Sequence, residues 1–135
     1  MNDINLDYLF SEARKAADFA YAPYSKFRVG AALLFEDGTV ITGCNVENRS
    51  FGLTVCAERN AVFKAISVGQ KSFKALAVST PDSEIPVGPC GACRQVLSEF
   101  MPPSSPVLFA GSGKDKVTST MGELYPFDSL HDLSP

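Results

Sequence analysis

Three cysteines stand at the starts of two predicted helices, and this arrangement most strongly constrains how the chain can fold. Cys56 opens the run CAE over residues 56–58, while Cys90 and Cys93 form a C-x-x-C motif within PCGAC over residues 89–93. A helix start carries partial positive charge and unpaired N–H groups, which stabilise a thiolate. The strand predicted between the two helices can bring both helix starts to the same end of one sheet. We therefore expect the three thiols to lie together.

Hydrophobic spacing predicts the elements around these cysteines. Apolar residues three and four positions apart predict a helix over residues 5–20, which the segment 21–25 ends because proline disfavours helix in the preceding residue. Short apolar runs bounded by turn residues predict strands, and the turn at 36–38 joins the first two as a hairpin. The predicted strands cover residues 27–35, 39–44, 73–80, 107–110 and 116–119. Further helices are predicted over 55–68, stopped by Gly69, over 91–100, and after the capping box of Thr120 and Glu123.

This order of elements predicts a single α/β domain over residues 1–135, built around one sheet. The hydrophobic fraction of 45% and charged fraction of 20% are typical of globular proteins. A net charge of −3 argues against nucleic-acid binding, which favours a basic surface. No apolar run approaches the roughly 18 residues of a membrane span, and the N-terminus lacks signal-peptide features, so we expect a cytoplasmic protein with no membrane partner. The single histidine, His131, argues against Ser–His–Asp hydrolysis.

The grouped cysteines favour a metal site, because thiols stay free in a reducing compartment. Three thiolates suit zinc, and three protein ligands leave the fourth tetrahedral position for water, which is the catalytic pattern. Glu58 lies two residues beyond Cys56 and is close enough in the sequence to act as a general acid and base. Arg59 and Arg94 each follow a residue of this group, and we expect them to offset the negative charge of three thiolates.

Two other interpretations of the cysteines remain open from the residues alone. With Cys44 included, four cysteines would make a closed structural zinc site with no open position. Against this, Cys44 falls within a predicted strand, where a lone cysteine is usually a small buried hydrophobe. A thioredoxin-like redox motif is less favoured, because that motif follows the first strand of a βαβ unit, whereas this one follows a third strand and a proline-rich loop.

Four motifs together resemble the zinc cytidine deaminases of the small homotetrameric type. CAERNA over residues 56–61 and PCGACRQVL over 89–97 carry the cysteines and the glutamate of that family. YAPYSKFRVGAAL over 21–33 and GCNVENRSFGLT over 43–54 are similar to further family segments, in the same order and at the same spacing. The resemblance extends from about Leu6 to Pro126 and implies a three-layer α/β/α sandwich around a mixed five-stranded sheet.

The resemblance implies roles for individual residues. Cys56, Cys90 and Cys93 match the ligands of one zinc ion per subunit, and Glu58 matches the catalytic proton shuttle. Arg59 matches an arginine that hydrogen-bonds the zinc thiolates. Four further residues match substrate-binding positions of the family: Phe27 in the nucleoside pocket, Asn45 and Glu47 at the ribose hydroxyls, and Ala57.

The implied activity is hydrolytic deamination of cytidine and deoxycytidine to uridine and deoxyuridine, in pyrimidine salvage. Zinc-bound hydroxide would attack the amino-bearing ring carbon while Glu58 moves the protons. The family also implies a homotetramer whose neighbouring subunits help to build each pocket. The chain departs from the family near its C-terminus, where Ser129 stands in place of a phenylalanine given to a neighbouring pocket. Whether Phe127 replaces that aromatic is left open, as are the preference between the two nucleosides and the roles of Cys44 and His131.

Three rival functions are distinguished from this one. A deaminase of a modified cytosine nucleoside, such as a blasticidin-like antibiotic, would keep the zinc site, but Phe27, Asn45 and Glu47 favour the ordinary nucleoside. A tRNA or DNA deaminase usually has histidine as its first ligand, and the net charge of −3 disfavours a polyanion. A non-catalytic zinc module would use all four cysteines, so loss of Cys44 would release its metal.

Overall fold

A computed structural model describes residues 4–135 and contains one five-stranded sheet with helices on both faces. The strands are β1 (Gly30–Phe35), β2 (Val40–Cys44), β3 (Phe73–Ser79), β4 (Pro106–Ala110) and β5 (Lys116–Thr120). The α-helices are α1 (Leu6–Ala17), α2 (Ala57–Ser67), α3 (Gly91–Ser98) and α4 (Met121–Leu124). Short 3-10 turns are η1 (Phe51–Leu53) and η2 (His131–Leu133). Among residues 4–135, no helix combines the length and apolar content needed to cross a membrane.

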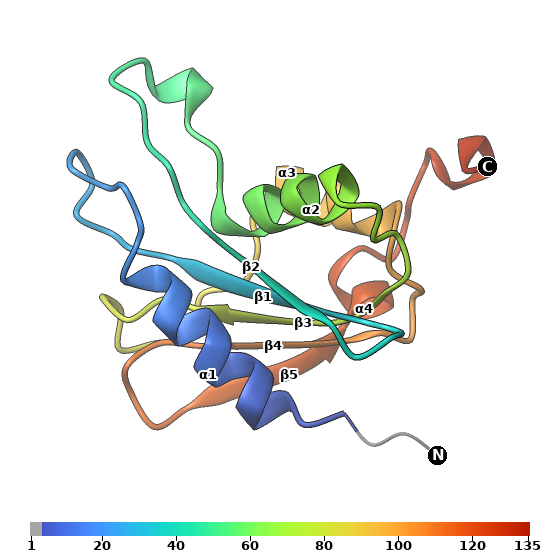
Figure 1. Ribbon diagram of the computed structural model, residues 1–135, viewed down its shortest axis with the longest axis horizontal. Helices are drawn as coiled ribbons and strands as arrows, with labels where there is room; N and C mark the ends of the chain where they lie inside the picture. Colours follow the sequence, from blue (N-terminus) through green and yellow to red (C-terminus); the bar gives the residue numbers. More distant parts are fainter. Residues whose placement is uncertain (1–3) are drawn as a thin grey trace.

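The sheet has the strand order β2-β1-β3-β4-β5, with β3 and β4 parallel and every other neighbouring pair antiparallel. Helix α1 covers one face, and α2 and α3 lie side by side over the other (Figure 1). Each face has its own core, because successive side chains of a strand point to opposite sides. Leu33 and Val78 pack under α2 and α3, whereas Ala32 and Ala77 pack under α1. The predicted mixed α/β/α sandwich is therefore confirmed.

Both helices that carry the cysteines begin at the same edge of the sheet. Strand β1 runs antiparallel to both β2 and β3, so β2 and β3 point in the same direction. Gly30, the first residue of β1, pairs with Cys44 and Ser79, the last residues of β2 and β3. Helix α2 follows β2 and α3 follows β3, so each helix starts beyond this edge. Two consecutive strand–helix units thus direct their helix starts to one place.

Helix α2 packs very closely on β2 at Gly43. A Cβ atom at this position would lie 2.5 Å from the backbone nitrogen of Ala61 and 2.6 Å from the carbonyl oxygen of Ala57. Only glycine leaves room for the helix backbone to approach the strand this closely. Because Ala57 is the first residue of α2, this contact fixes the start of the helix against the end of β2.

The predicted stop and cap signals are confirmed. Gly69 follows α2 with φ +87°, a backbone conformation that side chains with a Cβ rarely adopt. The Thr120 hydroxyl accepts from the backbone N–H of Glu123 at 3.2 Å, and the Glu123 carboxylate accepts from the backbone N–H of Thr120 at 3.1 Å. This reciprocal pair is the capping box that starts α4.

Some predicted boundaries are wrong by two or three residues, for local reasons. Helix α1 ends at Ala17 rather than at residue 20, because its last N–H groups switch to carbonyls three residues back. Strand β1 begins at Gly30 rather than at Phe27. Before Gly30 the backbone bonds the side chain of Asn45 instead of a neighbouring strand, with Val29 N–H donating to Asn45 Oδ1 at 2.8 Å. Val55, predicted as helix, instead forms an isolated bridge with Val46.

Candidate active site and metal centre

Cys56 and Cys90 occupy the N-cap positions of α2 and α3. Both have extended backbone conformations, with φ −68° and ψ 157° at Cys56 and φ −69° and ψ 169° at Cys90. Neither side chain makes the usual capping hydrogen bond to its own helix. Cys93 lies in the first turn of α3 and is fully buried. The two uncapped thiols are therefore free to face Cys93 instead of their own helix backbones.

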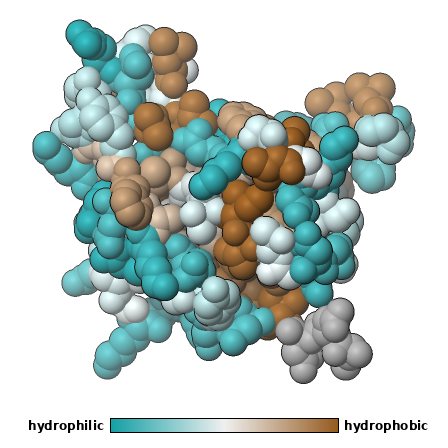
Figure 2. All heavy atoms as spheres, viewed as in Figure 1, coloured by the Kyte–Doolittle hydropathy of each residue, from teal (hydrophilic) through white to brown (hydrophobic). Residues whose placement is uncertain are grey.

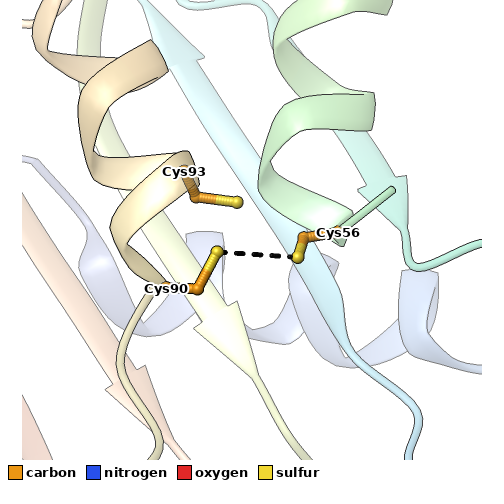
Figure 3. A group of neighbouring side chains, drawn as sticks. All are labelled: Cys56, Cys90 and Cys93. Atoms are coloured by element: carbon orange, nitrogen blue, oxygen red, sulfur yellow. Dashed lines mark hydrogen bonds between the residues drawn. The ribbon is translucent and has the colours of Figure 1, made fainter. Parts of the chain in front are cut away.

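The three thiols converge beyond the sheet edge, and Figure 3 shows their side chains pointing toward one another. Their sulfur atoms all lie within 4.8 Å of one another, and Cys56 Sγ and Cys90 Sγ are 3.7 Å apart. Two sulfurs bound to one tetrahedral zinc ion at about 2.3 Å are separated by about 3.8 Å. Within residues 4–135 these cysteines are the one group of such residues arranged to hold a metal ion. The donor chemistry and the spacing both fit zinc.

Neighbouring donors favour ionisation of Cys56. A hydrogen bond with Cys93, followed by contacts with Arg59 and Cys90, lowers the pKa of the Cys56 thiol to about 5. The same hydrogen bond, together with burial, raises the pKa of the Cys93 thiol. Arg59 Nη2 lies 3.4 Å from Cys56 Sγ. A thiolate is thus favoured at the first ligand, and a guanidinium is positioned to neutralise part of its charge.

Glu58 is the second residue of α2, and its side chain is buried, with 4% of the residue exposed. Burial raises the pKa of its carboxyl to about 7, and the nearby Cys56 charge acts in the same direction. A carboxyl with a pKa near neutrality can both accept and release a proton at physiological pH. Only Ala57 lies between Cys56 and Glu58, so the carboxyl belongs to the same helix start as the first thiol.

Asn45 and Glu47, predicted to bind ribose hydroxyls, both hold the loop before β1 in the structure. Asn45 Nδ2 donates to the carbonyl of Phe27 at 2.8 Å, in addition to the bond from Val29 N–H. The Glu47 carboxylate accepts from the backbone N–H of Tyr24 at 3.0 Å and from the N–H and hydroxyl of Ser25. These contacts lower the pKa of Glu47, with the Ser25 hydroxyl as the largest cause. Both side chains therefore shape the segment 24–29.

The other predicted substrate-binding residues lie near the same edge. Phe27 is half-buried and precedes β1 by three residues. Ala57 is fully buried at the first position of α2, where backbone N–H groups have no partner within the helix. The structure thus brings the segments of Phe27, Asn45 and Ala57 to the sheet edge where the cysteines lie.

Three residues lie outside the thiol cluster. Cys44 ends β2 and is not part of the group, and burial raises its pKa. The guanidinium of Arg94 donates to two carbonyls, of Pro89 at 2.8 Å and of Leu124 at 3.0 Å, and its expected role in offsetting the thiolates stays a prediction. His131 lies in η2 near the C-terminus, beside a cavity of about 590 Å³ that none of the three cysteines lines.

Asn60 is a site-supporting residue that the sequence reasoning missed. Its Nδ2 donates to the carbonyl of Cys44 at 2.8 Å and to that of Val55 at 3.3 Å. It therefore ties the first turn of α2 to the end of β2 and to the residue before Cys56. The sequence shows only a polar residue inside a helix, and its partners depend on how the loop 45–55 returns to the sheet.

A family described as the cytidine and deoxycytidylate deaminase zinc-binding region matches residues 4–108, a span that includes all three cysteines and Glu58. The chain belongs to the cytidine and deoxycytidylate deaminases. Among these deaminases, a cytidine deaminase of Sporosarcina psychrophila is 53% identical over 132 residues, which cover 97% of this chain and 96% of the relative. One from Halalkalibacterium halodurans is 51% identical over 118 residues, covering 87% and 89%.

The fold agrees with this membership. The crystal structure of a cytidine deaminase from Burkholderia pseudomallei has a TM-score of 0.86 and 44% identity, and the match covers 91% of this chain and 98% of that one. The resemblance drawn from the four motifs is confirmed, and the chain is an enzyme of the small zinc-dependent deaminase type. Zinc is its cofactor, and the cluster of Cys56, Cys90 and Cys93 is compatible with holding it.

Proposed function

We propose that the protein deaminates cytidine and deoxycytidine hydrolytically, releasing ammonia and forming uridine and deoxyuridine. The observation that carries this proposal is the convergence of three thiols at two helix starts beside the buried carboxyl of Glu58. Three thiol ligands leave one tetrahedral position open, as catalytic zinc requires. The relatives named cytidine deaminase support cytidine as a substrate. We assign the reaction to pyrimidine salvage in the cytoplasm.

Cys56, Cys90 and Cys93 would hold the zinc ion. The ion supplies Lewis acidity that makes water a nucleophile near neutral pH. Glu58 takes the proton released by the attacking water and passes it to the ring nitrogen beside the amino-bearing carbon, which makes that carbon electrophilic. The water oxygen adds to that carbon, Glu58 carries the remaining proton from the new hydroxyl to the amino group, and ammonia leaves as the carbon–nitrogen bond breaks and the product carbonyl forms. The raised pKa of Glu58, about 7, suits a group that must both accept and donate.

The nucleoside would lie between the cysteine cluster and the loop before β1. In this assignment Phe27 packs against the nucleoside, and the backbone of Ala57, the first residue of α2, bonds the base. Asn45 and Glu47 bind the ribose hydroxyls. The Glu47 carboxylate already accepts bonds from Tyr24 and Ser25, so a ribose hydroxyl would share these oxygens or replace the Ser25 hydroxyl.

We further propose a homotetramer in which neighbouring chains complete each pocket. The outer face of α2 and the turn η1 expose large apolar side chains, namely Phe51, Leu53, Phe63 and Val68. Figure 2 shows apolar side chains gathered in a band that runs from α2 across β2, the edge strand. Such patches are typical of subunit contacts. Phe127, 92% exposed, is available to a neighbouring chain.

The decisive experiment follows the loss of amino-pyrimidine absorbance with cytidine, deoxycytidine, cytosine and deoxycytidine monophosphate in parallel. Turnover of both nucleosides, and of neither the base nor the nucleotide, is the expected result. Chelation of zinc should abolish it. If none of the four reacts while about one zinc per chain stays bound, the proposal is wrong, and blasticidin-like nucleosides become the next substrates to try.

Glu58→Gln is the matched variant for the mechanism. The amide keeps the size of the side chain but cannot carry the proton, so kcat should fall by about 10²- to 10⁴-fold. Zinc content and melting temperature should stay at the wild-type level. Substantial turnover in the variant would refute the shuttle role of Glu58 while leaving the substrate assignment intact.

A further inference from the structure

Arg28 and Asp82 form a forked ion pair that no part of the proposed chemistry uses. Arg28 Nη2 donates to Asp82 Oδ1 at 2.8 Å and Nε donates to Oδ2 at 3.0 Å. The backbone N–H of Arg28 also donates to Oδ2, at 2.9 Å. Two side-chain bonds and one backbone bond therefore fix both the position and the orientation of the Arg28 peptide. Forked contacts of this kind are more directional than those of a lysine.

The Arg28–Asp82 pair joins two segments that both lead to the candidate active site. Arg28 follows Phe27 in the loop before β1. Asp82 lies just after β3, in the segment that leads to Cys90 at the start of α3. Arg28 and Asp82 are 54 residues apart, and both strands reach the same sheet edge, where Gly30 pairs with Ser79. The contact thus links the Phe27 loop to the segment that leads to Cys90.

The loop before β1 requires stabilising contacts, because its backbone is locally strained. Lys26 has φ +61°, a left-handed conformation that residues with a Cβ adopt rarely. Asn45 bonds the carbonyl of Phe27 and the N–H of Val29. Between these two groups along the chain, the N–H of Arg28 donates to Asp82. The peptide between Phe27 and Arg28 is therefore held at both its oxygen and its nitrogen, by two separate segments of the chain.

We propose that Arg28 and Asp82 are a positioning pair for nucleoside binding. By holding the Phe27–Arg28 peptide against the segment before Cys90, the pair fixes the distance between the aromatic wall of the pocket and the metal centre. This inference rests on the proposed function, in which Phe27 packs against the nucleoside. The pair acts through Phe27 and does not itself touch the reacting atoms.

The test measures KM and kcat for cytidine, with the zinc-loaded enzyme, for Asp82→Asn, Arg28→Lys and the double variant. Asp82→Asn should raise KM about fivefold and leave kcat within about twofold, because binding is lost equally from the ground and transition states. Arg28→Lys keeps the charge but loses the fork, so its KM should rise less. The KM of the double variant should equal that of Asp82→Asn alone, because both substitutions act on the same ion pair.

Asp7→Asn is the matched control, because it makes the same chemical change in an exposed pair, with Lys116 at 3.2 Å, between α1 and β5. Its KM should equal that of the wild type. Provided that the wild type deaminates cytidine, an unchanged KM in both single variants overturns the inference. So do effects on KM that multiply in the double variant, and so does loss of zinc in Asp82→Asn. A wild-type enzyme that deaminates no nucleoside would instead refute the proposed function, and this inference with it.

Discussion

Cys56 and Cys90 stand where a helix usually has serine, threonine, asparagine or aspartate. Those residues accept a hydrogen bond from the helix backbone and stabilise it by about 1 kcal/mol. The thiols of Cys56 and Cys90 make no such bond, and they point to each other across the sheet edge. Both helices thus give up a local stabilising contact so that their first side chains can bind the metal.

The first prediction separates the clustered cysteines from the remaining one. Cys93→Ala should lose zinc, because it removes one of three converging thiols, whereas Cys44→Ala should keep about one zinc per chain. Metal analysis after gel filtration distinguishes the two variants directly. Retention of zinc by Cys93→Ala together with its loss from Cys44→Ala would favour a structural zinc module instead.

The second prediction concerns acid stability at Asp82. The Arg28 guanidinium holds the pKa of the Asp82 carboxyl at about 2, below its usual 3.8. A lowered pKa means that the ion pair stabilises the fold above about pH 4, and that this contribution disappears as the pH falls toward 2. Asp82→Asn should therefore unfold more easily than the wild type at pH 6, by at most about 1 kcal/mol because the pair is partly exposed.

Thermal or urea unfolding of both proteins between pH 6 and pH 2 measures this difference. The gap in unfolding free energy should close as the pH approaches 2. A gap of constant size over this whole range would mean that the carboxylate charge is not its source. Asp7→Asn, in a mostly exposed pair, should show almost no gap at any pH.

Residues whose role follows from their own chemistry could be predicted from the sequence. Cys56, Cys90 and Glu58 lie at recognisable helix starts, so their chemistry could be inferred from adjacent positions. The partners of Asn45 and Arg28 could not be predicted, because they lie 16 to 18 and 54 residues away and depend on how the loops return to the sheet edge. The resemblance of four motifs to the deaminase family identified Asn45 as a candidate substrate-binding residue, but its contacts are known only from the structure.

At the scale of elements, the site depends on the close contact between β2 and α2. The backbone of Ala57 and Ala61 lies where a side chain at Gly43 would project. Any added atom there must push the start of α2 away from the sheet, and Cys56 and Glu58 move with it. The precision of the metal centre is therefore set partly by a residue that carries no functional group.

The third prediction tests this contact with Gly43→Ala. The added methyl group should destabilise the protein by about 1–3 kcal/mol through overpacking, and it should also weaken zinc binding. Gly52→Ala is the matched control, because its added Cβ would have open space around it. Unfolding curves and competition with a zinc chelator measure the two effects. Wild-type zinc affinity in Gly43→Ala would show that the start of α2 tolerates displacement.

The boundaries of the elements were less predictable than their order. Hydrophobic spacing gave the correct sequence of helices and strands, because burial on one face imposes a period. The start of β1 was misplaced because Phe27 and Val29 are apolar but bond Asn45 rather than another strand. A side chain from a loop can take the place of a strand partner, and local spacing carries no sign of it.

For the whole molecule, the fourth prediction is that four chains assemble. Phe63, 52% exposed on α2, belongs to the apolar surface that runs toward β2. Phe63→Glu should disrupt the assembly and lower the specific activity, whereas Val117→Glu, on the edge strand at the opposite side of the sheet, should leave it intact. Light scattering coupled to gel filtration measures the mass. Full activity in a monomeric protein would contradict the shared pocket.

The placement of the thiols on two successive strand–helix units also sets an order of events during synthesis. Cys56 leaves the ribosome 34 residues before Cys90, so the first ligand must wait while α2, β3 and the following loop are made. The nascent chain can complete its set of sulfurs only when Cys93 has emerged. All three thiols can therefore hold the metal only after the first residues of α3 have been made, and a cell short of zinc would accumulate chains that lack the metal.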